Sequence, residues 1–302
     1  MEALISKVGL FDDLVFRFFG RLIARQFVVF GGVPAALRRG EKLLARGVVP
    51  TYNRIDEHVH SRGRVEEILA SYVALVTTMD YVNYGNVAIK PSAFGMELGS
   101  FVFARTLRRF IDAVSGKYLE IEIDAERHET LCAVQFALNS LARKLPKGIV
   151  LRPALQMHLP DELYEKLITE LNILDMPLRI VKGSELYGTS ASRASDTEML
   201  ARYYETFRQQ IGKRKNPNAA TVRDKKLLKA IVAFADSEHV PSDRFGFQFL
   251  DGPFGRSLAR KYAALGYRVG CYVTFVDSSA PDEWQGYVRR RIAFGRKLLF
   301  GK

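Results

Sequence analysis

Residues 119–124 read LEIEID, and this stretch decides the fold class of the chain. It is short, rich in apolar β-branched residues and ends on an aspartate, which is typical of a β-strand. An amphipathic run follows over residues 125–145, with apolar residues at i, i+3 and i+4, and residues 148–152 form a second strand-like run. A strand, a helix and another strand in this order predict parallel pairing through a crossover helix.

The same alternation extends along most of the chain. Further strand-like runs occupy residues 86–90, 178–182, 219–221, 245–250 and 268–275. Amphipathic runs lie between them, at residues 65–77, 101–114, 160–171, 197–211, 224–235 and 255–265, and a last helix is expected from residue 287 to about residue 300.

These units predict an α/β fold, a (β/α)8 TIM-like barrel over residues 63–302, preceded by a helical N-terminal arm over residues 1–62. The alternative is an open doubly wound sheet. Against that alternative, no GxGxxG motif follows the first strand.

The composition is that of a soluble globular protein. Of the 302 residues, 48% are hydrophobic and 26% are charged, and no apolar stretch is long enough for a transmembrane helix. Cys132 and Cys271 are too few for a disulfide framework and form no CxxC pair, which favours a reducing cytoplasm. No signal peptide is expected, because Asp12 and Asp13 precede any uninterrupted apolar run.

The charge balance favours an anionic partner. Lysine and arginine number 45 against 33 acidic residues, which gives a net charge of +12. Nucleic acid, an acidic membrane face and an anionic ligand all suit this charge, and a solvated basic surface is the alternative. RNA-reading aromatic motifs are absent, so nucleic acid is not the expected partner.

The segment 10–30 combines apolar residues with a row of arginines. Arg17, Arg21 and Arg25 are four residues apart and therefore share one helical face, among several phenylalanines. Such a helix suits the interface of an anionic bilayer, which would give a cytoplasmic protein peripheral contact with the inner membrane face. The interpretation that we favour over this one is a helix that packs on its own domain.

Polar and ionisable residues end each of the predicted strands. In a parallel barrel the chemistry lies at the carboxyl ends of the strands, so these side chains are expected to line one mouth. Lysine, arginine and one aspartate at a mouth suit an anionic ligand or a phosphate-bearing cofactor. The residues are Lys90, Asp124, Arg152, Lys182, Thr221, Gln248 and Tyr272.

Several of these residues have two interpretations. Lys90 can pair with a carboxylate or form a Schiff base, and it can equally be a solvated strand end. Asp124 can cap the helix that follows it. Arg179, Lys182 and Gly183 together can hold a phosphate or an electron-rich ring oxygen.

Two motifs lie outside the strand ends. The arginines at 289–291 can clamp one carboxylate, or they can form a basic helix face for lipid or nucleic acid. His58 and His60 form an HxH pair, but no other histidine ends a predicted strand, so no metal site is expected. No GxSxG motif is present, and no Ser-His-Asp arrangement has a local signature.

Six short motifs follow one another along the chain: residues 45–59, IKPSA at 89–93, IDAE at 123–126, RIVKG at 179–183, FQFLDG at 247–252 and YVRRR at 287–291. In this order they resemble motifs of the proline dehydrogenase family of flavin-dependent barrel enzymes. The first resembles the stretch that precedes the family's barrel. The others are similar to its iKpSalG, iDAE, RlVKG, FQ.L.GM and YL.RRl.E motifs, and Tyr272 falls in a further strand that resembles the family.

The resemblance implies a (β/α)8 barrel whose last helix covers the mouth. It also implies FAD as cofactor, L-proline or a related amino acid as substrate, Δ1-pyrroline-5-carboxylate as product and a quinone as electron acceptor. By resemblance, Arg290, Arg291 and Lys90 would hold the substrate carboxylate. Tyr272 and Tyr287 would wall its ring, and Asp124 would lie by the reacting centre. Flavin contacts would come from Arg152, Arg179, Lys182, Gly183, Thr221 and Gln248.

The chain departs from the family pattern at four places. SEL at 184–186 replaces AYW, RPA at 152–154 replaces QAY, and TVR at 221–223 replaces THN. Phe294 replaces an acidic residue near the arginine pair. Three of these changes fall on the expected flavin side, whereas the substrate arginines remain. The alternative function is therefore a degenerate barrel that binds an anionic ligand, or performs non-redox chemistry, without flavin.

Overall fold

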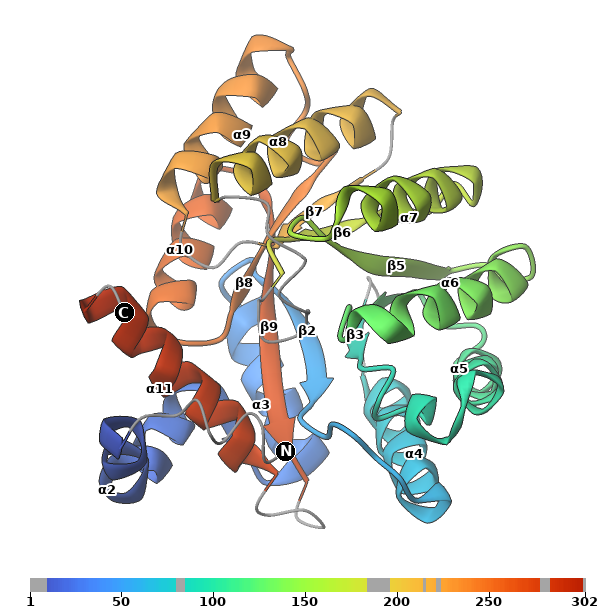
Figure 1. Cartoon of the computed structure of the whole chain (residues 1–302), viewed down its shortest axis with the longest axis vertical. Helices are drawn as coiled ribbons and strands as arrows, with labels where there is room; N and C mark the ends of the chain where they lie inside the picture. The colour runs from blue at the N-terminus through green and yellow to red at the C-terminus, as the bar shows by residue number, and fades with distance from the viewer. Residues whose placement is uncertain are drawn as a thin grey trace.

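A computed structural model describes residues 10–79, 85–183, 196–213, 216–220, 224–277 and 283–300. Within these residues, eight parallel strands close into a barrel (Figure 1). The strand order follows the chain, and β9 pairs with both β8 and β2, which closes the sheet. The predicted (β/α)8 architecture is confirmed. The strands are β2 (Val49–Arg54), β3 (Gly85–Ile89), β4 (Leu119–Ile123), β5 (Ile149–Gln156), β6 (Arg179–Val181), β7 (Asn218–Ala220), β8 (Gly246–Leu250) and β9 (Arg268–Val276).

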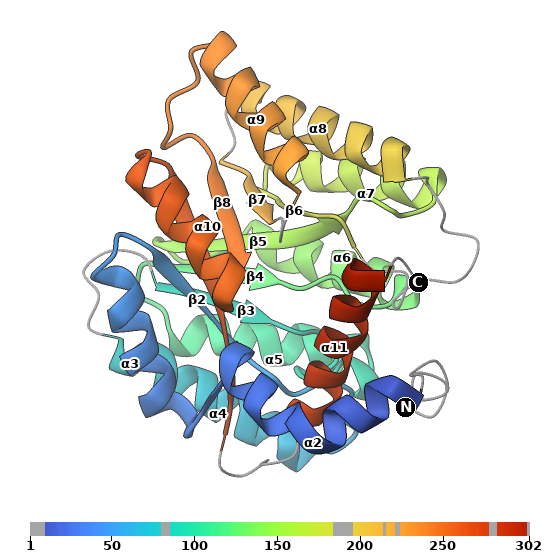
Figure 2. The same cartoon turned by 90° about the vertical axis from the view of Figure 1, so that its left-hand side faces the viewer.

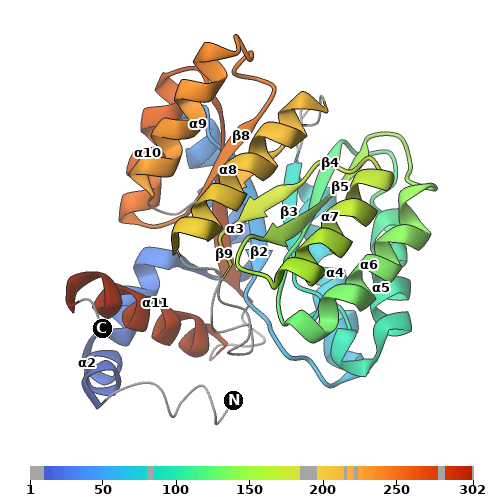
Figure 3. The same cartoon turned by 45° about the horizontal axis from the view of Figure 1, so that its top comes forward.

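The helices between the strands form an outer layer around the barrel (Figure 2). Figure 3 shows the same layer from a third direction. A short 3-10 helix, η1 (Met96–Leu98), precedes α5. The helices are α4 (Arg62–Thr78), α5 (Ser100–Ala113), α6 (His128–Ala142), α7 (Asp161–Ile173), α8 (Asp196–Gly212), α9 (Lys225–Ser237) and α10 (Pro253–Ala264).

Strand β4 shows how the barrel divides its side chains. Successive side chains of a strand point to opposite faces. Ile121 and Ile123 are buried in the apolar core between strands and helices. Glu120 and Glu122 alternate with them, and Glu122 accepts hydrogen bonds from Gln248 on the non-neighbouring strand β8. That contact crosses the barrel, so the interior is polar and the apolar core lies outside it.

The first barrel strand lies inside the range that was predicted as a helical arm. β2 (Val49–Arg54) pairs with β3 and β9, so the barrel begins at Val49 and the predicted boundary at residue 63 is wrong. The alternating Thr51 and Asn53 are polar, and Pro50 disfavours a strand, so the stretch lacks a strand signature. In the fold both polar side chains are buried, and Asn53 Nδ2 donates to Ala88 O at 2.9 Å.

Among the described residues, three elements precede the barrel: α2 (Leu10–Phe27), β1 (Val28–Phe30) and α3 (Gly32–Leu44). β1 pairs with the carboxyl end of β9. Helix α2 packs beside the last helix, α11 (Trp284–Phe300), and the two lie side by side in Figures 1 and 2. Their shared core includes Ile55 just after β2 and Val276 at the end of β9, so α11 lies at the carboxyl end of the barrel.

Among the described residues, no helix combines the length and the apolar character needed to span a membrane.

Candidate functional site

Charged side chains fill the barrel from its amino end upward. Near that end, Glu120 receives hydrogen bonds from Arg152 Nη2 at 3.0 Å and Arg268 Nη1 at 3.1 Å. Arg152 is 1% exposed, so its charge is neutralised inside the protein. The prediction that Arg152 ends a strand is wrong. Strand β5 continues through Pro153 to Gln156, because its last three residues pair with β6 after the first five pair with β4.

Glu122 forms the next layer. Its two carboxylate oxygens accept from Gln248 Nε2 at 2.7 and 2.8 Å, and Oε2 lies 3.3 Å from Arg179 Nε. The side chain is fully buried, and burial raises the pKa of Glu122 despite the neighbouring Arg179. Glu122 therefore holds Gln248 and Arg179 from below.

Asp124, Arg179 and Tyr272 meet above that layer. Arg179 Nη1 donates to Asp124 Oδ1 at 2.8 Å, and Arg179 Nε donates to Gln248 Oε1 at 2.5 Å. The Tyr272 hydroxyl donates to Asp124 Oδ2, and the Arg179 guanidinium lies 5.1 Å from the centre of the Tyr272 ring. Burial, together with the Asp124 carboxylate, raises the pKa of Tyr272 well above its usual value, so the phenol stays protonated.

The role of Asp124 as a helix cap is excluded by the geometry. Helix α6 begins at His128, and the residue before it, Arg127, is the N-cap and makes no side-chain capping bond. Both Asp124 oxygens instead receive hydrogen bonds from across the barrel. The backbone N–H of Asp124 donates to Ile89 O at 2.9 Å, which places it next to Lys90.

Lys90, Glu57 and Arg290 form an ion-paired cluster at the rim. Lys90 Nζ lies 3.0 Å from Glu57 Oε1 and donates to Ile55 O at 2.9 Å. Arg290 Nη2 donates to both Glu57 oxygens, at 2.7 and 2.8 Å. Burial by itself would raise the pKa of Glu57, but Lys90 and Arg290 outweigh it and lower the pKa to about 2. The cluster therefore carries two cations and one anion at neutral pH.

Glu57 and Glu126 are site residues that the sequence interpretation missed. Glu126 accepts from Ser92 N at 2.8 Å and from Ser92 Oγ at 2.7 Å, which fixes the turn that follows Lys90. Glu126 lies in the IDAE motif, and Glu57 lies three residues after β2. Recognition of β2 as a strand would have drawn attention to Glu57 as a residue near a strand end.

Arg291 and Tyr287 lie one turn apart on α11. The Arg291 guanidinium is 4.8 Å from the centre of the Tyr287 ring, and Tyr287 is buried. Arg291 Nε is buried, and it has no hydrogen-bond partner among the described residues. A buried N–H donor of this kind is costly unless an acceptor satisfies it, so the arrangement suits an anionic ligand.

Lys182 and Gly183 follow β6 directly. Lys182 Nζ lies 3.0 Å from Asp224 Oδ2, the side chain that caps α9. Gly183 has a φ of +90°, and a Cβ built there would lie 1.8 Å from His158 Nδ1, so glycine is required. Thr221 and residues 184–186 lie outside the described residues.

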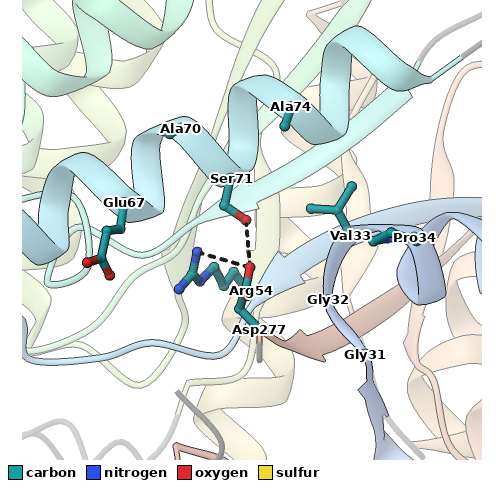
Figure 4. Close-up of a pocket in the computed structure, with 10 residues that line it drawn as sticks. All are labelled: Gly31, Gly32, Val33, Pro34, Arg54, Glu67, Ala70, Ser71, Ala74 and Asp277. Carbon is teal, nitrogen blue, oxygen red and sulfur yellow. Dashed lines mark hydrogen bonds and ion pairs between the residues drawn. The ribbon is translucent and has the colours of Figure 1, made fainter. Parts of the chain in front are cut away.

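A separate pocket of about 630 Å³ lies between α3 and α4 (Figure 4). None of the predicted site residues lines it. Its cation, Arg54, is ion-paired with Asp56 at 2.6 Å and lies 3.6 Å from Asp277, to which Ser71 also donates. The positive charge of Arg54 is therefore already paired with acidic side chains of this chain. No group of three potential metal ligands occurs among the described residues, and His58 pairs with Glu97 at 3.0 Å.

Comparison with solved structures gives several similar folds. Proline utilization A (PutA) from Bdellovibrio bacteriovorus, inactivated by N-propargylglycine, matches 89% of this chain at 19% identity and a TM-score of 0.75. PutA from Corynebacterium freiburgense matches 98% at 15% identity and 0.71, and a variant of PutA from Bradyrhizobium japonicum matches 92% at 16% identity and 0.70.

The match covers only part of each PutA protein. The chain spans 32%, 34% and 30% of the three PutA chains, respectively. No protein-family profile matches the chain, and no curated protein matches it in sequence. The chain therefore has a barrel fold that occurs within PutA, as its motif order predicts.

Proposed function

We propose that this chain oxidises L-proline, or a closely related amino acid, to Δ1-pyrroline-5-carboxylate, with FAD as hydride acceptor and a quinone as the final oxidant. One observation carries the proposal: Lys90 and Arg290 converge on Glu57 at the carboxyl end of the barrel. Arg291 follows Arg290 on α11, and its buried Nε has no partner among the described residues.

The rim cluster supports recognition of a carboxylate. Lys90 and Arg290 both pair with Glu57, so two cations lie side by side at the rim, where a substrate carboxylate would contact both. Glu57 holds the two cations in place, so their orientation is set before substrate binds. Arg291 would add a charge-assisted hydrogen bond through its Nε, which has no partner among the described residues.

Aromatic and acidic side chains complete the proposed substrate side. The Tyr272 ring lies against Arg179 and, with Tyr287, supplies apolar surface for a pyrrolidine ring. Asp124 accepts from both Arg179 and Tyr272, so each of its oxygens already has a donor. We assign Asp124 the role of orienting these two side chains at the reacting centre rather than that of a base.

The donor set at the opposite side of the mouth suits a flavin. Arg179 at the start of β6, Lys182 just after β6 and Gln248 in the middle of β8 supply cationic and amide groups. The Gln156 Oε1 atom is buried without a partner in the described part of the chain. These residues would hold FAD, which supplies hydride acceptance when bound. A fixed cation such as Arg179 favours the negative charge that reduction brings.

A visible absorption spectrum of the purified chain, recorded before and after anaerobic addition of L-proline, tests this function. A flavin spectrum that bleaches with proline is the expected result. A flavin spectrum that proline leaves unchanged, but that another cyclic amino acid bleaches, would assign a different substrate to the same chemistry. Protein that stays colourless after reconstitution with FAD would contradict the proposal.

A second function is favoured by the ion pairs of the two flavin-side cations. Arg179 pairs with Asp124 and contacts Glu122, and Lys182 pairs with Asp224. With these charges already satisfied, the barrel could bind an amino acid or another anion through the rim cluster alone, without redox chemistry. Equilibrium dialysis with labelled proline, on protein free of flavin, distinguishes the two functions. Tight binding of proline by protein that stays colourless after addition of FAD supports the second function.

A further inference from the structure

Helix α2 presents an exposed face that the proposed oxidation does not use. Leu14, Phe18 and Leu22 stand one helical turn apart, and their side chains are 56%, 69% and 61% exposed. Phe19 lies at the edge of this row and is 56% exposed. A contiguous row of large apolar side chains on a protein surface indicates contact with another apolar phase or molecule.

Three arginines border the apolar row. Arg17, Arg21 and Arg25 are exposed, and none of them forms an ion pair within the part of the chain that the structure describes. Residues 14–27 contain no acidic residue, and Asp12 and Asp13 stand ahead of the row at the amino end of the helix. The row and these arginines together are called the α2 face below.

The opposite side of α2 is anchored in the folded domain. The Phe16 ring lies 5.7 Å from the Trp284 ring, and the Arg289 guanidinium lies 4.1 Å from the centre of Phe16. Ala24 is fully buried in the core that α2 shares with α11. Figures 1 and 3 show α2 at the outer edge of the molecule, beside α11. The α2 face is therefore held outward by packing.

We propose that the α2 face binds the surface of an anionic membrane. The helix would lie in the plane of the interface, with the apolar row among the acyl chains. The arginines have long apolar stems, so their guanidinium groups can reach lipid phosphates while the stems stay beside the row. Apolar side chains and exposed cations on one face match the two layers of such an interface. A free anion would bind to the arginines alone and would leave the apolar row in water.

A second copy of the chain is a poorer occupant. In a two-fold dimer the same patch meets itself, so the arginine row of one copy would lie close to that of the other. Like charges brought together in this way disfavour association. The charge of the α2 face therefore points to an anionic partner rather than to self-association.

Co-sedimentation of the full chain with vesicles tests the proposal. The probes are vesicles of phosphatidylcholine alone and of phosphatidylcholine with an equal amount of phosphatidylglycerol. We expect binding to the anionic vesicles, which added salt weakens. The triple variant Arg17→Gln, Arg21→Gln, Arg25→Gln should lower the partition coefficient roughly 100-fold, from the usual contribution of each basic residue near an anionic surface.

Two matched controls separate the α2 face from general surface properties. Arg38, Lys42 and Arg46 form a basic row with the same spacing along and just after α3, and they are exposed. Their triple substitution by glutamine removes the same charge from a different surface, and we expect it to leave most binding intact. Phe18→Ser with Leu22→Ser should lower binding at least about tenfold. Phe101→Ser, at a 76% exposed side chain on α5, should not.

Several outcomes would overturn the proposal. Wild-type protein that stays in solution with anionic vesicles is one, and equal losses from the α2 and α3 triple variants is another. Conversion of a dimer to a monomer by Phe18→Ser and Leu22→Ser, without vesicle binding, would assign the face to a second copy. Retention of the protein on duplex DNA that the α2 triple variant loses, again without vesicle binding, would assign the α2 face to nucleic acid. Vesicle binding is measured without substrate or flavin, so its result does not depend on whether the proposed oxidation is correct.

Discussion

Arg290 Nη2 lies 2.7 and 2.8 Å from the two carboxylate oxygens of Glu57, although 233 residues separate them in the chain. The contact joins α11 to the segment that follows the first barrel strand. Lys90 pairs with the same carboxylate at 3.0 Å, so one anion orients two cations. This geometry ties the last helix to the mouth and predicts that Glu57 matters for both stability and ligand binding.

Glu57 should make the stability of the protein depend on pH. Its pKa falls from 4.5 to about 2 in the folded state, so its stabilising effect is complete above pH 4.5 and is lost as the pH falls towards 2. From pH 7 to pH 3 the wild type should therefore lose about 2 kcal/mol more unfolding free energy than Glu57→Gln. Urea denaturation at the two pH values measures this difference.

The matched control for that experiment is Glu205→Gln, at an exposed glutamate on α8. It should keep the pH dependence of the wild type. Parallel pH profiles for the wild type and Glu57→Gln would show that the ion pairs with Lys90 and Arg290 do not stabilise the charged form of Glu57.

Arg290→Ala and Arg291→Ala should each raise the KM for the amino-acid substrate by about tenfold or more, if the proposed function holds, because each removes a charge-assisted contact to a carboxylate. Arg289→Ala is the control, because the Arg289 guanidinium lies over Phe16 of α2 instead. It should change the KM by less than about twofold. Steady-state kinetics with proline measures all three, and an unchanged KM in both test variants would remove the assignment of the carboxylate site.

Gly183→Ala should destabilise the protein more than Gly116→Ala does. Both glycines have a φ of +90°, so the backbone strain of an alanine is the same, on the order of 1 kcal/mol. A Cβ at Gly116 meets no atom within 4 Å, whereas at Gly183 it would lie 1.8 Å from His158 Nδ1. Urea denaturation of the two variants isolates the steric contribution, and equal losses would mean that His158 moves aside freely.

Glu122→Leu should cost about 3–5 kcal/mol of unfolding free energy, because it leaves Arg179 with less compensation in a buried site. The double variant Glu122→Leu, Arg179→Met should cost less than the sum of the two single variants. Chemical denaturation of all three proteins gives the coupling energy. Strict additivity would show that the 3.3 Å contact between the two side chains contributes nothing.

Much of the fold could be predicted from local patterns. Apolar β-branched runs such as residues 119–124 form strands where expected, because their outward side chains are buried under helices. β2 was missed because its alternating residues are polar. Arg152 was misplaced because Pro153 reads as a strand end, whereas β5 passes from one neighbour to the next at that proline.

The candidate site was predictable only in part. The strand-end pattern correctly placed Lys90 and Asp124 directly after two neighbouring strands, because parallel strands present their carboxyl ends on one side. Tyr272 lies in the middle of β9 and Gln248 in the middle of β8, so the prediction that they end strands is wrong. The pattern did not supply Glu57, which lies beyond an unrecognised strand. It also did not show that Arg179 and Lys182 have carboxylate partners, since Glu122 and Asp224 belong to other elements.

The sequence by itself determined the alternation of strands and helices, and with it a parallel barrel, because hydrophobic periodicity is a local property of the chain. Only the tertiary structure decided which charges meet. An ion pair depends on the distance between side chains, and closure of the barrel sets that distance for residues such as Glu57 and Arg290. The tertiary structure likewise decided that α2 packs by one face and leaves the opposite, apolar and basic face in solvent.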